Sequence, residues 1–142
     1  MNRRRQKKLS RRLVEAAKFD GVGVVRALVR AGADPNGANA DGTTPLYAAA
    51  VSGATEIVTY LLNVGASPDA ESLDEAEGTP LCAAAAWGHI DVARQLLVHG
   101  ASPDLREDGG EGHSPLEWAK DGGHTEIVEL LLLAGAPTDG PP

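Results

Sequence analysis

The residues of this chain that could do chemistry are few and widely spaced. The single cysteine, Cys82, stands in an alanine-rich run, where cysteine is more often a small buried hydrophobe than a nucleophile. His89 and His124 occupy matching places in two similar segments, and packed segments lie about 8–10 Å apart, too far for a shared zinc ion. The sequence contains no HExxH motif, no phosphate-binding Walker motif and no second cysteine. We therefore expect no catalytic residues, no cofactor and no metal site, and hence no enzyme.

Residues 79–104 show how the rest of the chain must be organised. A helix is predicted to start at Pro80, because proline is tolerated in the first helical turn, and to break at Gly88. A second helix follows, since apolar residues recur at helical spacing, and it ends at Gly100, a residue able to take positive φ. One such pair of helices cannot bury its own apolar faces, so it needs neighbours of the same kind.

These neighbours are visible as an internal repeat. A Thr/Ser-Pro-Leu triplet begins at Thr44, Thr79 and Ser114, at intervals of 35 residues. A Gly-Ala pair recurs at residues 32–33, 65–66, 100–101 and 135–136. Self-similarity at this period is typical of a solenoid built from stacked supersecondary units.

In these residues the chain resembles the ankyrin repeat family. The matching segments are TPLYAAAVSG with EIVTYLLNVGASPD, TPLCAAAAWGH with IDVARQLLVHGASPD, and SPLEWAKDGGH with TEIVELLLLAGA. The resemblance implies an all-α fold, an ankyrin-repeat solenoid of four stacked helix-turn-helix units with β-turn fingers. It also implies that His89 and His124 are structural residues at helix starts. The expected repeats are residues 11–36, 37–69, 70–104 and 105–137, before a disordered tail at 138–142. A basic N-terminal arm at 1–10 precedes them and is either frayed or a helical extension of the first repeat.

The fingers are expected at residues 35–43, 70–78 and 105–113, which are rich in turn-forming residues, and the second and third are acidic. The family usually has histidine after the triplet, where it forms hydrogen bonds between neighbouring fingers. This chain has Tyr47, Cys82 and Glu117 at that position. We therefore expect looser coupling between the fingers.

The resemblance further implies that the finger tips and the outward side of each first helix line a concave binding face. The candidate partner-binding residues are Asp41, Thr43, Glu75, Glu111 and His113 on the fingers, and Phe19, Val51, Ser52, Ala86, Trp87 and Asp121 on the helices. Phe19 and Trp87 fall at the same repeat position, and aromatic side chains open on such a face are typical interaction anchors. Alternatively, Trp87 folds over its own alanine-rich helix and covers apolar surface.

Charge is strongly segregated along the sequence. Residues 1–12 hold seven of the thirteen Lys and Arg and no acidic residue, which leaves six basic and twenty acidic residues in 13–142. A basic stretch of this length attracts polyanions, but the acidic body repels them, so we do not expect nucleic acid as a partner. Polyanion anchoring by the arm remains an alternative function, and a solvated arm is the simpler interpretation.

We predict a non-catalytic protein–protein interaction module that binds a partner with a basic or mixed apolar and basic surface. An alternative is an assembly role for the leucine-rich last repeat, because at least Leu133 of Leu130–Leu133 should face outwards. We expect a monomer with weak self-association at that point and no membrane span. The single cysteine and the absence of targeting features favour a cytoplasmic location, with a nuclear one if the arm is an import signal.

Overall fold

The computed structural model describes residues 2–19, 21–73 and 78–137, and this part of the chain is all-α. It contains eight α-helices, one short 3₁₀ turn and no strand. The helices are α1 (Arg3–Phe19), α2 (Val22–Arg30), α3 (Pro45–Ser52), α4 (Thr55–Asn63), α5 (Pro80–Trp87), α6 (Ile90–Val98), α7 (Pro115–Asp121) and α8 (Thr125–Leu133), and η1 (Asp108–Gly110) precedes α7. The predicted fold class is confirmed.

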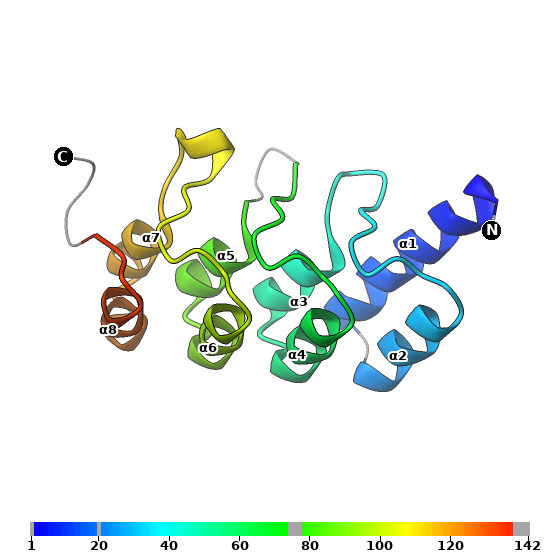
Figure 1. Ribbon diagram of the computed structural model, residues 1–142, viewed down its shortest axis with the longest axis horizontal. Coiled ribbons are helices and arrows are strands. Elements are labelled where there is room, and N and C mark those ends of the chain that lie inside the picture. Colours follow the sequence, from blue (N-terminus) through cyan, green and yellow to red (C-terminus); the bar gives the residue numbers. More distant parts are fainter. Residues whose placement is uncertain (1, 20, 74–77, 138–142) are drawn as a thin grey trace.

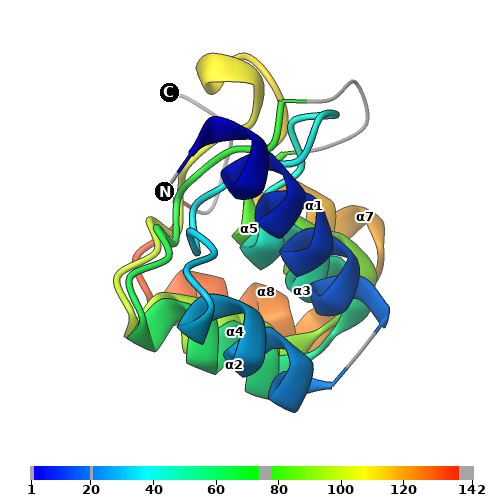
Figure 2. The same ribbon diagram turned by 90° about the vertical axis from the view of Figure 1, so that its right-hand side faces the viewer.

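The helices form two parallel rows that run the length of the molecule. The inner row is α1, α3, α5 and α7, and the outer row is α2, α4, α6 and α8 (Figure 1). Each inner helix contacts the outer helix that follows it and the next inner helix along the row. The loops that precede α3, α5 and α7 rise above the inner row as fingers (Figure 2). Contacts therefore join neighbouring units, as expected for a solenoid.

Three inner helices begin in the same way. The hydroxyl groups of Thr44, Thr79 and Ser114 accept a hydrogen bond from the backbone N–H three residues later, and proline occupies the first helical position. This arrangement satisfies one free N–H of the first turn and places at the helix start a residue that has no N–H to lose. The Thr/Ser-Pro-Leu triplet is thus a helix-start signal in each unit.

The outer helices end in a second recurrent structure. Gly65 and Gly100 follow α4 and α6 with φ of +105° and +94°, a conformation that glycine adopts without a Cβ penalty. The alanine that follows each glycine donates its N–H to a leucine carbonyl five residues earlier, at 2.9 Å for both Ala66–Leu61 and Ala101–Leu96. The Gly-Ala pair therefore satisfies a helix-end carbonyl and turns the chain towards the next finger.

Alanine fills the space between neighbouring inner helices. Ala48–Ala50 in α3 and Ala83–Ala85 in α5 are all buried, so adjacent inner helices pack closely. Each of the eight helices also buries a leucine in the core. These buried leucines are Leu13, Leu46, Leu81 and Leu116 in the inner row and Leu28, Leu61, Leu96 and Leu131 in the outer row. The low aromatic content of the chain follows from these thin layers.

The basic N-terminal segment is helical and continuous with the first unit. Helix α1 runs without interruption across residue 10, where we expected the arm to end, and it is twice as long as the other inner helices (Figure 1). Leu9 and Ser10 are buried, and the Gln6 side chain donates to the carbonyl oxygen of Gly32 at 3.1 Å. These contacts hold the basic segment against the first unit.

At the other end, α8 leaves part of its leucine run uncovered. Leu131 is fully buried, whereas Leu133 is 87% exposed, as the sequence predicted. The predicted disordered tail at 138–142 lies outside the described residues. Among the described helices, none combines the length and the apolar character needed to cross a membrane.

Candidate functional site

The first finger is shaped by one asparagine. The Oδ1 atom of Asn39 accepts hydrogen bonds from the N–H groups of Asp41 and Thr43, each at 3.0 Å, and the Asn39 N–H donates to the Thr43 carbonyl at 2.9 Å. Gly42 completes the turn with φ of +86°. The Asp-Gly turn signal of the sequence therefore marks a finger tip that is closed by hydrogen bonds and leaves Asp41 exposed.

Neighbouring fingers are joined by hydrogen bonds between adjacent units. The Leu73 N–H donates to the Gly42 carbonyl at 3.2 Å, and the Thr44 N–H donates to the hydroxyl oxygen of Ser72 at 3.1 Å. Between the second and third fingers, the Asp108 N–H donates to the Glu71 carboxylate at 2.6 Å. One bond between backbone groups and two bonds from backbone N–H groups to side-chain oxygens thus connect the fingers.

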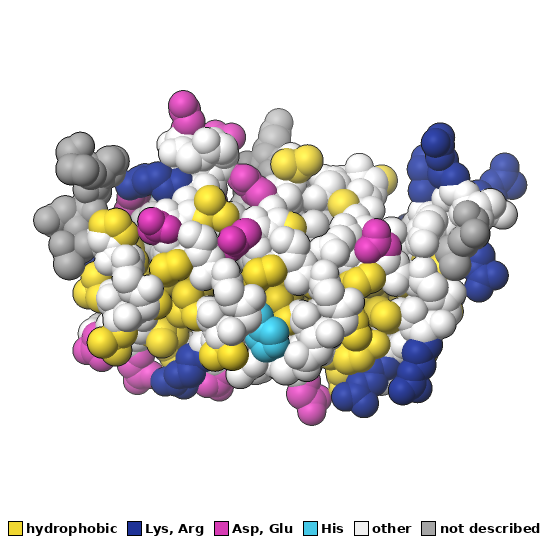
Figure 3. Space-filling view, in the orientation of Figure 1, with side chains coloured by type: hydrophobic (Ala, Val, Ile, Leu, Met, Phe, Trp, Pro, Cys, Tyr) yellow, Lys and Arg dark blue, Asp and Glu magenta, His cyan; other side chains and the backbone are white. Residues whose placement is uncertain are grey.

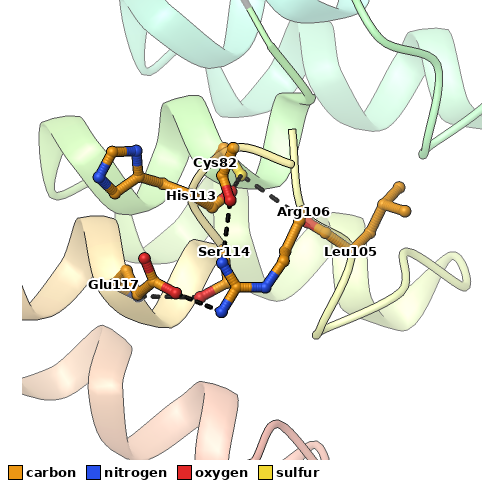
Figure 4. Close-up of polar contacts among 7 residues, drawn as sticks. Cys82, Leu105, Arg106, His113, Ser114 and Glu117 are labelled. Atoms are coloured by element: carbon orange, nitrogen blue, oxygen red, sulfur yellow. Dashed lines mark hydrogen bonds and ion pairs between the residues drawn. The ribbon is translucent and has the colours of Figure 1, made fainter. Parts of the chain in front are cut away.

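Cys82 lies under the third finger as a structural residue. Its Sγ atom is 3.7 Å from the carbonyl oxygen of His113 and 3.9 Å from that of Leu105, at the two ends of the finger (Figure 4). Burial raises the pKa of the Cys82 thiol far above its usual range, and the nearby Glu107 adds to this effect. A thiol that stays protonated is a weak donor and a poor nucleophile, in agreement with the buried structural role expected for it.

The third finger is also fixed to α7 by charged and aromatic groups. The Trp118 indole N–H donates to the Glu107 carboxylate at 3.0 Å, and the His113 ring lies against the Trp118 ring with centroids 4.8 Å apart. Arg106 forms an ion pair with Glu117 (Figure 4). Desolvation raises the pKa of Glu107, although the hydrogen bonds from Trp118 and Cys82 oppose that rise. Trp118 is half-buried and holds the third finger against α7.

The two predicted aromatic anchors are both open to solvent. Phe19 is 81% exposed at the end of α1, and Trp87 is 64% exposed at the end of α5. Ser52, at the same repeat position in α3, is exposed as well. The structure thus brings the predicted helix positions into one row along the ends of the inner helices, and most of the Trp87 side-chain surface is exposed.

The remaining predicted partner-binding residues differ in how exposed they are. Asp41, Glu111, His113 and Asp121 are exposed, and Val51 and Ala86 are half-buried. Thr43 lies at the base of the first finger, where its backbone bonds to Asn39, and it is only 2% exposed, so its side chain is not available to a partner. Glu75 lies outside the described residues.

Val51 and Ala86 take part in contacts between neighbouring units through their backbone carbonyl groups. The Nε2 atom of His89 lies 3.0 Å from the Val51 carbonyl oxygen, and that of His124 lies 3.1 Å from the Ala86 carbonyl oxygen. Both histidines immediately precede an outer helix, as the resemblance implied. They connect the end of one inner helix to the next unit and keep the row of exposed positions in register.

The finger carboxylates and Trp87 lie at opposite ends of the inner helices. The second finger leads into Pro80, while Trp87 is the last residue of the eight-residue α5, about 10 Å further along the helix axis. The acidic residue nearest to Trp87 in the repeat pattern is Asp121, the exposed α7 equivalent of Ala86. A ligand that touched both the indole and the fingers would have to span the length of an inner helix.

Sequence reasoning missed Leu73 in the second finger. Its side chain is 83% exposed, among the most exposed large apolar side chains of the described residues. The signal was available, because Leu73 is the one large apolar residue in the otherwise polar and small segment 70–78. It adds an apolar contact point at the finger end of the face.

In the folded chain, the first helix pair is basic and the remaining units are acidic. Residues 1–33, which contain α1 and α2, carry ten basic and two acidic residues, whereas residues 34–142 carry three basic and eighteen acidic residues. Basic side chains gather at the α1–α2 end in Figure 3, and acidic ones are distributed over the remaining units. Among the described residues, no three His, Cys, Asp or Glu side chains lie close enough together to hold a metal ion.

The paired helices, their stacking and the finger loops define a helical repeat protein of the solenoid class. More specifically, the chain belongs to the ankyrin repeat family. A family model of three ankyrin repeats matches residues 13–107 and, in a second alignment, residues 66–139. A search of curated proteins found no significant match. Ankyrin repeats generally act as protein–protein interaction modules, and the proteins built from them are typically non-enzymatic adaptors.

Proposed function

We propose that this chain is a non-catalytic adaptor that binds a partner protein through its fingers and the exposed ends of its inner helices. The observation that carries this proposal is the exposure of Trp87, at 64%, at the end of a helix in which Ala83–Ala85 are buried. Tryptophan is among the residues that dominate measured binding energies at protein interfaces. Because Trp87 lies on a helix, a partner could cover its exposed indole at little cost in conformational entropy.

The charges of this face indicate the chemistry of the partner. Asp121 is exposed near the Trp87 position, and Asp41 and Glu111 are exposed on the fingers. Opposite charges across an interface steer association and favour the correct partner. A partner with an apolar side chain for Trp87 and basic side chains about 10 Å away would complement both ends of α5.

The proposal is tested by comparing Trp87→Ala with Val98→Ala as affinity baits, followed by binding measurements on a captured and purified partner. Val98 is 76% exposed on the outer helix α6, so its replacement controls for loss of an exposed apolar side chain elsewhere. We expect Trp87→Ala to weaken the Kd by about tenfold or more and Val98→Ala to leave it unchanged. Equal affinity of the two variants and the parent would contradict the proposal.

Leu133 favours a second candidate function, the assembly of this chain with a copy of itself. This side chain is 87% exposed beside the partly buried Leu132, and burying it would be favourable. A monomer that self-associates weakly through Leu130–Leu133 remains our proposal for the free chain. A cytoplasmic location remains a proposal as well, with a nuclear location if residues 1–10 direct import.

A further inference from the structure

A groove lies between the N-terminal half of α1 and the first finger. It has a volume of about 650 Å³, which is in the range of small-ligand sites. One wall consists of four basic side chains, Arg4, Lys7, Lys8 and Arg11, and the other consists of residues 38–40 of the finger. The groove exists because α1 continues for two turns beyond the length of the other inner helices and rises beside the finger (Figure 1).

The four basic residues form one face of the helix. Their spacing of three, four and seven residues places them on one side of α1 over about 10 Å, while Leu9 and Leu13 are buried in the core. All four side chains are exposed. Within the described residues, ion pairs join Asp91 to Arg94 and Glu117 to Arg106, and no carboxylate pairs with the four.

This uncompensated charge has an energetic consequence. Like charges three or four residues apart on a helix repel each other, and the groove wall contains several such pairs. An anion bound in the groove would relieve this repulsion and would form charge-assisted hydrogen bonds with the same side chains. The groove therefore favours the binding of a negatively charged ligand.

The surroundings of the groove limit the size and kind of that ligand. Residues 34–142 carry fifteen more acidic than basic residues, so a long polyanion that extended along the array would be repelled. The groove lining contains no aromatic side chain on which a nucleic-acid base could stack. Instead, the methyl groups of Ala38 and Ala40 and the aliphatic stems of the basic side chains provide apolar contact for a peptide.

We propose that this groove binds a short acidic peptide segment of a partner protein. The carboxylates of the peptide contact Arg4, Lys7, Lys8 and Arg11, and its backbone lies against residues 38–40 of the first finger. This site does not include Trp87, although it shares the first finger with the proposed partner-binding face, and it prefers the opposite charge. A partner could therefore be recognised by the groove whether or not Trp87 is an anchor.

The test uses the full chain and a fluorescein-labelled hexaglutamate peptide, followed by fluorescence anisotropy. The variant Lys7→Glu/Lys8→Glu is compared with Arg3→Glu/Arg12→Glu, which changes the charge of the same helix by the same amount at exposed positions outside the groove. We expect the first variant to weaken probe binding by about tenfold or more and the second by less than about threefold at low salt. A third variant, Ala40→Glu, places a negative charge on the finger wall and leaves α1 unchanged, and it should also weaken binding.

Several outcomes would overturn the proposal. Equal loss in the two double variants, with circular dichroism showing both to be folded, would mean that only overall charge attracts the probe. Unchanged binding in Ala40→Glu would remove the finger from the site. A thymidine hexanucleotide that bound more tightly than the peptide under the same conditions would replace the acidic peptide with nucleic acid as the ligand, and vesicles of anionic lipid that did so would replace it with a membrane.

Discussion

The Nε2 atom of His124 lies 3.1 Å from the carbonyl oxygen of Ala86, and its ring covers Gly88 at the end of α5. His89 has the same relationship to Val51 and Gly53 in the preceding unit. Carbonyl groups in the last turn of a helix have no partner within the helix, so these bonds satisfy them from the next unit. The histidine ring fits because the residue beneath it has no side chain.

Replacement of Gly88 by alanine is therefore expected to destabilise the array. A Cβ atom at Gly88 would lie 2.7 Å from the His124 ring, and the φ of +76° is strained for alanine. We expect Gly88→Ala to lower the free energy of unfolding by about 2–3 kcal/mol, measured by denaturant titration. Gly123→Ala is the matched control, because Gly123 has a φ of +70° at the equivalent position with open space around it. A smaller loss, of about 1 kcal/mol, is expected there, and equal losses would show that the histidine contact is unimportant.

Local sequence signals predicted most of this fold. The Thr/Ser-Pro start and the Gly-Ala end are determined within a few residues, and the structure shows both as predicted at Thr79 and Gly100. The sequence left open whether the basic arm is frayed or a helical extension of the first repeat. The helix begins with a local cap, because Asn2 Oδ1 accepts a hydrogen bond from the Arg5 N–H at 2.8 Å, and it is held to the first unit by distant contacts, such as the bond from Gln6 to Gly32 and the burial of Leu9. Periodicity within residues 1–10 carries no information on those contacts.

The candidate site was predictable only in part, for a similar reason. The repeat register correctly placed Phe19 and Trp87 on the surface, because equivalent positions in a solenoid share an environment. It could not show that Thr43 closes the base of its finger, since that depends on the conformation of Asn39. The basic groove was missed because it needs both α1 and the first finger, which come together only in the folded chain.

The raised pKa of Glu107 predicts a pH-dependent effect of Glu107→Gln. Because desolvation raises the pKa in the folded chain, the folded chain holds this proton more tightly than the unfolded chain. The contribution of Glu107 to stability is therefore greatest below its unfolded pKa and falls as the pH rises through the raised folded value. Glutamine is uncharged and still offers an oxygen to the Trp118 N–H. We expect Glu107→Gln to raise the Tm at about pH 7 and to have little effect at about pH 4.

The control for this prediction is Glu111→Gln in the same finger. Glu111 is exposed, so removing its charge changes the net charge equally without relieving burial. Thermal unfolding followed by circular dichroism should show little change in Tm for this variant at either pH. A shift of the same size in both variants would attribute the effect to net charge, and a lower Tm for Glu107→Gln at neutral pH would contradict the prediction.

Burial of Cys82 predicts that its thiol is unreactive in the folded chain. The side chain is 1% exposed, and burial raises the pKa of the thiol well above its usual range, so very little thiolate forms at about pH 8. We expect a colorimetric thiol reagent to modify Cys82 only when guanidinium unfolds the chain. The Ser52→Cys change in a Cys82→Ala background provides an exposed thiol on a neighbouring inner helix, which should react at once. Comparable rates for the two thiols in the folded state would show that the third finger opens readily above Cys82.

The exposed leucine of α8 predicts how any self-association can be removed. Leu133 and Val98 occupy equivalent positions at the ends of α8 and α6 and are 87% and 76% exposed. If copies of the chain associate through the last repeat, Leu133→Glu places an uncompensated charge in that contact and should abolish association, because burying an unpaired carboxylate is costly. Val98→Glu makes a comparable change at an exposed site outside the contact and should leave association intact. Light scattering after size exclusion at two protein concentrations checks this prediction. Association that is lost equally in both variants, or kept in both, would show that the leucine run is not the contact.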